Sequence, residues 1–557
     1  LELYSNSFYK ALPTLKNGFM QDKMCDVGAV SNTDTFIKQG AYNTETATSW
    51  SWGALKNVNY FIDGCNDPKY CTVEAETRDN YLGIARWFRA WFYYDKLTTY
   101  GEVPWFPNDI QSYQNDVMYK DRDSRDVIIR NLIADLDFAY EHIQATSSTG
   151  SATLTRWAAA ALKSRVCLFE AAYRRYHNLT GLEITPEELY REAAKAAKLV
   201  IDNSGCSLNT AAGKKGAYRD LFYSETPLTQ EVILAVCANE KSGIFGEQNW
   251  WFNARSYGLC WSLVRSFVHT YLKQDGTPFT AAADYAVKSF AEEMEGRDLR
   301  LEQTVRGRNF LWDGKTAVAD IKNLSLTGYQ VIKYTLDESK YDGGAKNINS
   351  IPLIRYAEVL LNYAEAQAEL GVLTDSEWAL TVGALRKRAG ITGGTETLPT
   401  TVDSYLQSTF YPDVTSPVLL EIRRERAIEL VAEGMRFDDL RRWKCGSLME
   451  TLPWSGIHIP GLEQPVDVNG DGVNDYYFTE GEVASAPAAY KNIAVRVNQD
   501  GVGLYAEANA VSGYDLVYKT GAGDRYWYPD GRQYLYPIPA KVIRDYRNAG
   551  YTISQNP

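Results

Sequence analysis

The sequence predicts a mostly α-helical protein in which helix pairs form a tetratricopeptide-like scaffold, with long irregular loop regions and minor β structure. Apolar residues recur at helical spacing in two groups of segments. Outside these groups the chain is rich in Gly, Asn, Thr and aromatic residues. We therefore expect one domain over residues 1–557, with a scaffold over about 78–203 and 351–445 and loop regions over about 26–72, 205–350 and 453–530.

The first helical group is predicted over residues 79–97, 124–143, 154–176 and 186–202. The third and fourth of these segments carry small residues, which let helix axes approach closely, as in tetratricopeptide-like pairs: Ala158 to Ala161, Ala171, Ala193, Ala194 and Ala197. The periodicity does not show a strict 34-residue repeat.

The second helical group is predicted over residues 353–370, 376–389 and 417–433. The last segment places Leu420, Ala427, Leu430 and Val431 at helical spacing, and Gly434 permits the left-handed conformation that ends a helix. A second short helical piece is expected from Arg436 to Trp443. On spacing alone, the many Glu and Arg residues of this segment are typical of a solvated helix face.

The order of residues in this segment carries more information than its spacing. Glu425, Arg426, Glu429, Glu433, Gly434, Arg436, Asp438, Leu440, Arg441, Arg442 and Trp443 resemble the "ER..EL..EG.R..DL.RW" segment of the SusD/RagB family. Further segments resemble the same family in the same order: RDNYLGIARWFRAWFYYDKLTTYGEVPWFP, TRWAAAALKSRVCLFEAAY, IPLIRYAEVLLNYAEAQAELG with LRKRAGI, and YLYPIP with the terminal QNP. Together they span nearly the whole chain.

This resemblance implies about four helix pairs in a right-handed scaffold. It also implies a cell-surface protein of Bacteroidetes-type bacteria that binds oligosaccharide or polysaccharide, is held in the outer membrane by a lipid anchor, and delivers glycans to a SusC-like TonB-dependent transporter. RagB-like uptake of peptides is the alternative within the family, and a helical-repeat glycosidase is a third. The Glu and Arg residues of the signature segment are then expected to hold scaffold helices together and to touch no ligand.

Composition limits the remaining classes of function. The net charge is −12 and no dense basic tract occurs, which argues against nucleic acid and anionic lipid as partners. No apolar run approaches the roughly 18 residues of a membrane-spanning helix. The chain begins at Leu1 without an initiator methionine, so we interpret it as a mature or trimmed chain whose signal peptide and lipid anchor lie outside it.

Eight cysteines are spread without CxxC spacing, which favours neither a zinc ribbon nor a redox motif. Cys65 and Cys71 are close enough in sequence to close a local disulfide. Buried free thiols are the alternative, because Cys167 lies on an apolar helix face.

Aromatic residues are the best candidates for ligand contact, since the chain has 14 Trp and 39 Tyr. Trp50 and Trp52 are separated by one residue and would share one face of an extended segment. Trp250 and Trp251 lie in a glycine-flanked loop, and Trp312 lies among polar and charged residues. An exposed indole covers the apolar face of a pyranose while polar neighbours bind its hydroxyls. Packing of each indole between loop and scaffold is the alternative.

The starch-binding member of the family builds its ligand arc from an early loop and a mid-chain loop, and the positions similar in place here are Trp50, Trp52 and Trp312. The nearest polar residues are Lys56, Asn57 and Asn309. The other tryptophans on predicted helix faces are expected in the core: Trp87, Trp91, Trp157 and Trp443.

The segment DVNGDGVND predicts a structural calcium site. Asp467, Asn469, Asp471, Val473 and Asp475 supply side-chain or backbone oxygens at loop positions 1, 3, 5, 7 and 9, with a glycine at position 6 for the sharp turn. Position 12 is Phe478 rather than Glu, so the remaining ligands must come from elsewhere or from water. A plain Asx-rich turn is the alternative.

No pattern in the sequence indicates catalysis. The four histidines His142, His177, His269 and His458 are scattered, and neither HExxH nor GxSxG occurs. A phosphate loop around Gly213, Lys214 and Lys215 fails, because position 208 is Leu. We therefore expect a binding protein and not an enzyme.

Overall fold

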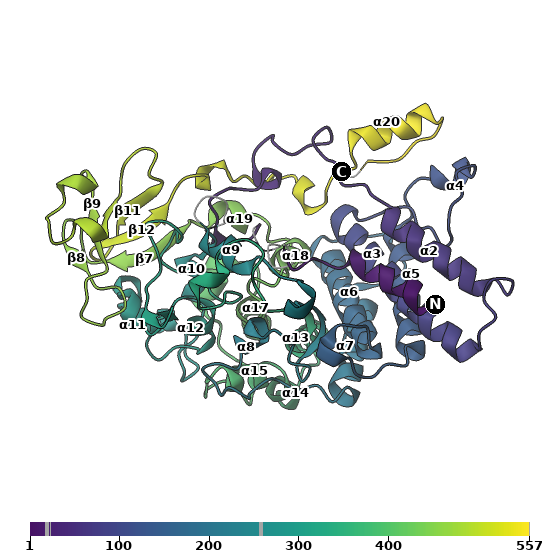
Figure 1. Ribbon diagram of the computed structural model, residues 1–557, viewed down its shortest axis with the longest axis horizontal. Coiled ribbons are helices and arrows are strands. Elements are labelled where there is room, and N and C mark those ends of the chain that lie inside the picture. Colours follow the sequence, from purple (N-terminus) through teal and green to yellow (C-terminus); the bar gives the residue numbers. More distant parts are fainter. Residues whose placement is uncertain (17–21, 23, 255–259, 556–557) are drawn as a thin grey trace.

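The computed structural model describes residues 1–557 except 17–21, 23, 255–259 and 556–557. Asn556 and Pro557 of the closing QNP motif thus lie outside the described residues. Figure 1 shows an elongated molecule with its long helices at one end and most of its strands at the other. No helix in the described ranges is both long enough and apolar enough to cross a membrane.

The scaffold is a layered series of helices that pack in chain order. Helix α2 packs on α3, α3 on α5, α5 on α6, α6 on α7, α7 on α13 and α13 on α17. The bounds of the scaffold helices are α2 Gly53–Asn66, α3 Ala75–Tyr100, α5 Arg125–His142, α6 Arg156–Tyr176, α7 Pro186–Asn203, α13 Tyr356–Glu369, α14 Asp375–Leu380, α15 Val382–Arg388, α16 Ser404–Phe410, α17 Pro417–Glu429 and α18 Arg436–Arg442. The predicted helical scaffold is confirmed.

Local chemistry defines where several of these helices begin. Ser124 and Ser416 accept hydrogen bonds from backbone amides in the first turns of α5 and α17. Thr185 and Glu188 form a capping box at α7, with proline at its first helical position. The alanines that predicted close packing of α6 on α7 are buried in one large hydrophobic cluster.

Outside the scaffold the chain forms short helices and small sheets, part of which pack around a second hydrophobic cluster. The short helices are α1 Glu2–Ser5, α4 Asn115–Met118, α8 Asp220–Tyr223, α9 Gln248–Asn253, α10 Arg265–Val268, α11 Phe290–Met294, α12 Arg300–Thr304, α19 Leu448–Thr451 and α20 Ala540–Asn548. The strands are β1 Gly28–Ala29, β2 Val232–Val236, β3 Ser262–Leu263, β4 Leu311–Trp312, β5 Lys315–Thr316, β6 Ile351–Arg355, β7 Ser455–Ile459, β8 Pro465–Val466, β9 Tyr476–Thr479, β10 Ala494–Arg496, β11 Leu504–Ala508 and β12 Tyr514–Tyr518.

These strands pair into five small sheets. Antiparallel pairs join β1 to β3, β2 to β6, and β4 to β5. Strand β12 lies between β11 and β7, antiparallel to both, and β9 pairs antiparallel with β8 and parallel with β10. The β2–β6 pair ties the central loop region to the start of α13, because β6 leads directly into that helix.

Three sequence-based element boundaries are wrong. Residues 26–72 contain the helix α2, although they were expected to be an irregular loop. The segment expected as one helix over 376–389 is split into α14 and α15 at Thr381, whose φ and ψ are −106° and −94°. The first residues of the segment expected over 353–370 belong to strand β6.

Helix α17 ends earlier than expected because side chains take its last carbonyl groups. The carbonyl of Glu429 accepts from Tyr218 Oη at 2.7 Å and from Arg355 Nη2 at 2.7 Å. The carbonyl of Val431 accepts from Lys333 Nζ at 2.7 Å. Gly434 does adopt the left-handed conformation that was predicted, with φ of 81°.

Candidate functional site

The signature helix α17 carries a buried ion-pair network and presents no charged face to solvent. Glu429 is fully buried and accepts from Arg300 Nη1 at 2.8 Å, from Arg355 Nη1 at 2.6 Å, and from Arg388. Burial alone would raise the pKa of Glu429, but the three guanidinium groups hold it well below its ordinary value. The same network ties α17 to β6, α12 and α15. The solvated-face interpretation is thus wrong, and these residues join scaffold elements.

Trp50 and Trp52 form an aromatic pair beside helix α3. Their rings lie edge to face with centroids 5.4 Å apart. Trp50 also contacts Tyr100 at 4.8 Å, and Trp52 contacts Phe106 at 5.2 Å. Both indoles are half-buried. Each therefore packs on the scaffold through one part of its side chain and leaves another part open to solvent.

The polar residues predicted beside this pair differ in how freely they can reach a ligand. Asn57 Oδ1 accepts from Tyr4 Oη at 2.9 Å, and Asn57 Nδ2 donates to Ser7 Oγ at 3.1 Å. Lys56 is exposed, and its Nζ lies 3.8 Å from Asp109 Oδ1. Asn57 thus holds the N-terminal helix to α2, whereas the Lys56 side chain is held only weakly.

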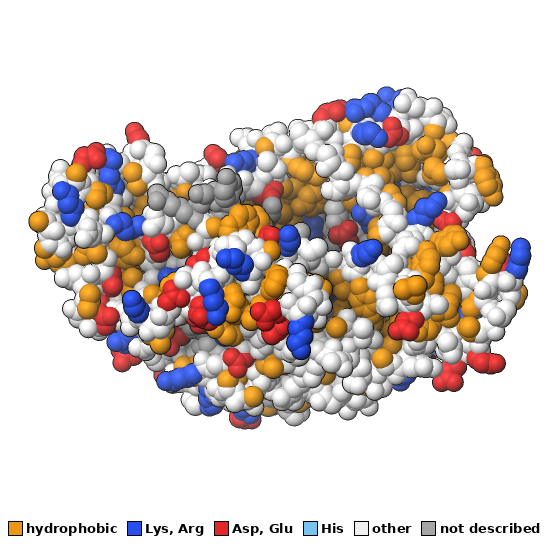
Figure 2. All heavy atoms as spheres, in the orientation of Figure 1, with side chains coloured by type: hydrophobic (Ala, Val, Ile, Leu, Met, Phe, Trp, Pro, Cys, Tyr) orange, Lys and Arg blue, Asp and Glu red, His pale blue; other side chains and the backbone are white. Residues whose placement is uncertain are grey.

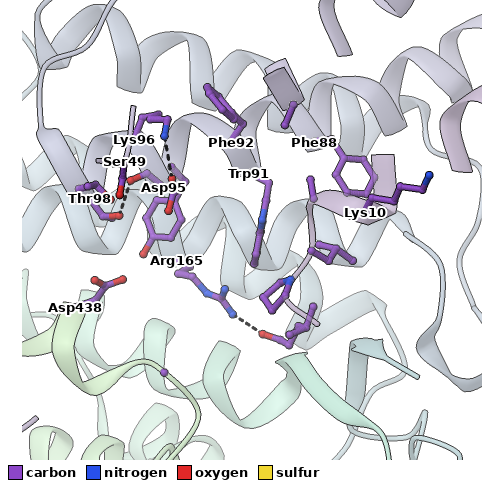
Figure 3. A pocket seen from close by; sticks show the side chains of 18 of the residues that line it. Lys10, Ser49, Phe88, Trp91, Phe92, Asp95, Lys96, Thr98, Arg165 and Asp438 are labelled. Atoms are coloured by element: carbon purple, nitrogen blue, oxygen red, sulfur yellow. Dashed lines mark hydrogen bonds and ion pairs between the residues drawn. The ribbon is translucent and has the colours of Figure 1, made fainter. Parts of the chain in front are cut away.

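A cavity of about 1230 Å³ adjoins the Trp50–Trp52 pair. Ser49 and Gly53, which flank the pair in sequence, both line it. Its walls come from the N-terminal segment, helices α2 and α3, strand β6, the segment from Glu433 to Arg441, and Tyr536 near the C-terminus. Figure 3 shows aromatic and polar side chains around the same space, and Figure 2 shows a recess with hydrophobic side chains on one face of the molecule.

Trp91 lines this cavity, although the sequence placed it in the core. Trp87, Trp157 and Trp443 are buried as expected, but Trp91 is half-buried. Its ring stacks on Trp87 with centroids 5.3 Å apart and planes 13° apart. One face of the indole is thus occupied by the core, while the side chain projects into the cavity (Figure 3). Helical spacing gave no signal for this difference, because Trp87 and Trp91 are four residues apart on the same helix face.

The second set of predicted aromatic residues lies in the central loop region. Trp312 is at the end of β4, and an Asp313–Gly314 turn with φ of 49° and 74° returns the chain into β5. The Trp312 ring is half-buried and lies 5.2 Å from the Arg306 guanidinium. Asn309 is exposed just before this hairpin.

Trp250 and Trp251 are on the short helix α9, not in an irregular loop. Their rings are edge to face at 4.7 Å, and both are half-buried. Asn249 fixes the helix by donating to Leu336 O at 2.7 Å and to Asp342 Oδ1 at 3.1 Å. The segment after Leu336 also contacts the Trp312 hairpin, because Ser339 N donates to Asp313 Oδ1 at 2.9 Å. The segment 336–342 therefore contacts both the helix that carries Trp250 and Trp251 and the hairpin that carries Trp312. Trp50 and Trp52 instead pack beside α3.

The Asp467–Asp475 loop folds through its own side-chain oxygens. Asp467 accepts from the amides of Gly470 and Gly472, both at 2.7 Å, and Asp475 Oδ2 accepts from Val468 N at 2.8 Å. Burial raises the pKa of Asp475, and the charges of Asp467 and Asp471 raise it further. Among the described residues no three His, Cys, Asp or Glu side chains converge as a metal centre.

Cys65 and Cys71 are free thiols whose side chains are within hydrogen-bonding reach of one another. Burial, followed by the neighbouring Cys71, raises the pKa of Cys65 to about 12.

Comparison with known proteins identifies what this chain is similar to. A model of the SusD family matches residues 230–557. Among solved structures, a SusD-like protein from Bacteroides fragilis is 21% identical with a TM-score of 0.68, covering 100% of this chain and 96% of that chain. A SusD-like carbohydrate binding protein from the same species is 18% identical with a TM-score of 0.69, covering 98% and 97%.

A third structure, described as being with xylogluco-oligosaccharide, is 18% identical with a TM-score of 0.52 and covers 79% of this chain and 82% of that chain. No curated protein matches the chain. At 18 to 21% identity, these solved structures show that the fold is shared and nothing more specific.

Proposed function

We propose that this chain, which belongs to the SusD family, binds oligosaccharide or polysaccharide at the cell surface. We infer that it passes the glycan to a SusC-like TonB-dependent transporter while a lipid anchor outside this chain holds it to the outer membrane. Binding is expected without turnover of the ligand.

The observation that carries the proposal is the position of Trp50 and Trp52 beside a large open cavity. An indole covers the apolar face of a sugar ring, and groups at its edge exchange hydrogen bonds with the hydroxyls. The cavity lining supplies such groups: Ser49, Thr98 and Thr99, beside Asn57, which is already bonded to Tyr4 and Ser7. Trp312 and Asn309, with Trp250 and Trp251 on the helix that the same segment 336–342 contacts, offer a second aromatic surface for a long glycan.

Affinity measurements on a panel of soluble polysaccharides, oligosaccharides and peptides test this function. Wild type is compared with Trp50→Ala, Trp52→Ala and Trp312→Ala, and Tyr113→Ala serves as control because Tyr113 is 80% exposed and does not line the cavity. Each tryptophan variant should lose about tenfold in affinity, since a stacking contact contributes roughly 1 to 2 kcal/mol. Retention of peptides but no glycan, or unchanged binding by all three variants, would overturn the proposal.

We also propose that the Asp467–Asp475 loop takes up one structural Ca²⁺. Support comes from the donor set, which consists only of oxygens in a loop whose glycines have φ of 76° and 88°. Asp467, Asn469, Asp471, the carbonyl of Val473 and Asp475 would hold the ion. Calorimetric titration of chelator-treated protein should give binding that Asp471→Ala removes, and absence of Ca²⁺ uptake by wild type would refute it.

A further inference from the structure

The cavity along α3 has the features of a binding site with its own aromatic platform. We propose that it is a glycan subsite in which Trp91 stacks on a sugar ring, and that it selects neutral over acidic sugars. This inference rests on the proposed function, because it assumes a carbohydrate ligand. It adds a contact residue outside the predicted Trp50, Trp52 and Trp312 set, and it names the class of sugar.

Trp91 is held rigidly from behind. Its ring stacks on that of Trp87, which is fully buried and whose Nε1 donates to the carbonyl of Ala158 on α6 at 3.1 Å. The platform is thus fixed to the backbone of a neighbouring helix through two stacked indoles. A ligand that stacks on Trp91 does not have to order this side chain, so less conformational entropy is lost on binding.

Polar side chains stand on both sides of the platform. Figure 3 places Trp91 between Lys10 on one side and Asp95 and Lys96 on the other. The Asp95 side chain is 67% exposed and its carboxylate lies 3.6 Å from Lys96 Nζ. Lys10 is exposed and has no ion-pair partner within the described chain. An aromatic face flanked by hydrogen-bond donors and acceptors suits a pyranose ring with hydroxyls around its edge.

The size of the cavity indicates more than one sugar unit. At about 1230 Å³ it exceeds the roughly 300 to 1,000 Å³ of most small-molecule pockets. Ser49 and Gly53 continue its lining to the Trp50–Trp52 pair. Trp50 and Trp52 do not themselves line the cavity, but an oligosaccharide that extends past Ser49 and Gly53 would run toward them.

Charge within the cavity favours a neutral ligand. Arg165 is held by Glu358, with two contacts of 2.7 Å, and Arg441 by Asp438 at 2.5 Å. Lys96 also faces the rings of Phe92 and Tyr100, at 5.1 and 5.6 Å. A uronate or sulfate beside Arg165, Arg441 or Lys96 would meet cations whose charge is already compensated, and would lose its hydration without a new countercharge. Lys10 has no such partner among the described residues, but it is exposed to solvent, so an ion pair with it would contribute little. Acidic and basic side chains are also interspersed on the face shown in Figure 2.

Calorimetry with defined oligosaccharides tests this assignment. The probes are neutral glucan, xyloglucan and mannan oligosaccharides on one side, and galacturonan and alginate oligosaccharides on the other. The proteins are wild type, Trp91→Ala, Trp91→Leu, and Tyr113→Ala as a control with an exposed ring outside the cavity. Leucine keeps an apolar side chain against Trp87, so a thermal unfolding scan of both Trp91 variants separates loss of the platform from loss of the fold.

We expect a neutral oligosaccharide to bind wild type and Tyr113→Ala equally and to bind both Trp91 variants about tenfold more weakly. Equal binding by folded Trp91 variants would overturn the subsite while leaving the proposed function intact. Acidic oligosaccharides that bind as tightly as neutral ones would overturn the charge selectivity. Failure of every glycan to bind wild type would refute the proposed function, and this inference with it.

Discussion

Replacing Glu429 with glutamine should be among the most destabilising single changes in the scaffold. The substitution keeps the volume of the side chain but removes the negative charge that Arg300, Arg355 and Arg388 share. Glu429 is 0% exposed, so water cannot replace the lost interaction. The amide would also direct an N–H₂ group toward guanidinium donors.

The expected loss in the free energy of unfolding depends on the carboxylate partners that each arginine retains. Arg300 retains Asp298 and Glu425, Arg355 retains Glu433, and Arg388 retains Glu231. Breaking a buried ion pair costs about 3 to 5 kcal/mol when a charge is left uncompensated. Because every arginine keeps at least one carboxylate, we expect a loss in the free energy of unfolding near the lower end, about 3 kcal/mol.

Chemical denaturation followed by tryptophan fluorescence measures this loss. Glu183→Gln is the control, since Glu183 pairs with Arg130 at 2.7 Å but the two side chains are 79% and 59% exposed. The control should change stability by about 0 to 1 kcal/mol. Similar losses in the two variants would refute the role assigned to burial. Folded Glu429→Gln protein should bind oligosaccharide as wild type does, and weakened binding would contradict a purely structural role.

Three further changes probe other parts of the fold. Gly328→Ala should lower the unfolding midpoint more than Gly40→Ala, because both have positive φ but a Cβ at Gly328 would lie 2.7 Å from a neighbouring side chain whereas Gly40 has open space. Burial lowers the pKa of His177 to about 4 from 6.5, so the unfolded chain binds the proton first as pH falls. The free energy of unfolding should then decline by up to about 3 kcal/mol as pH falls from 6.5 to about 4. His177→Gln should make this decline smaller. Arg423 packs against three aromatic rings, and its Nη2 has no hydrogen-bond partner within the described chain. Chemical denaturation should therefore show a smaller loss in the free energy of unfolding for Arg423→Met than for Glu429→Gln.

The scaffold was predictable because long helices repeat apolar residues at a period that only a helix satisfies. Helix α2 was missed, although Leu55, Val58, Ile62 and Cys65 follow the same spacing and are buried. Its polar, glycine-containing sequence is a weak helix former. The helix break at Thr381 was not predicted, because local spacing does not report contacts with residues farther along the chain. Next to the break, the backbone of Thr395 approaches Gly383 so closely that a Cβ at Gly383 would lie 2.0 Å from the carbonyl oxygen of Thr395.

The candidate site was only partly predictable. Trp50 and Trp52 were found because two indoles stand close together in a polar segment. Trp91 was not found, because its neighbours in sequence are those of a core residue. Its exposure arises because a cavity separates this part of α3 from the chain around Gly434. The local sequence around Trp91 carries no signal of such a cavity. The buried charges of α17 were assigned to a structural role only through the family resemblance, since spacing alone favoured solvent.

The hairpin that carries Trp312 has a consequence for how such a protein can change over evolutionary time. Within the described chain Trp312 belongs to neither of the two large hydrophobic clusters, whereas Trp50 and Trp52 pack against the first. Substitutions at the tip of β4 and β5 therefore place little of the folding free energy at risk. This aromatic residue can be replaced, or its turn lengthened, while the same helices are kept, and under the proposed function such a change would alter the glycan that is bound. Changes at Trp50 and Trp52 must remain compatible with α3, so we expect that end of the surface to diverge more slowly.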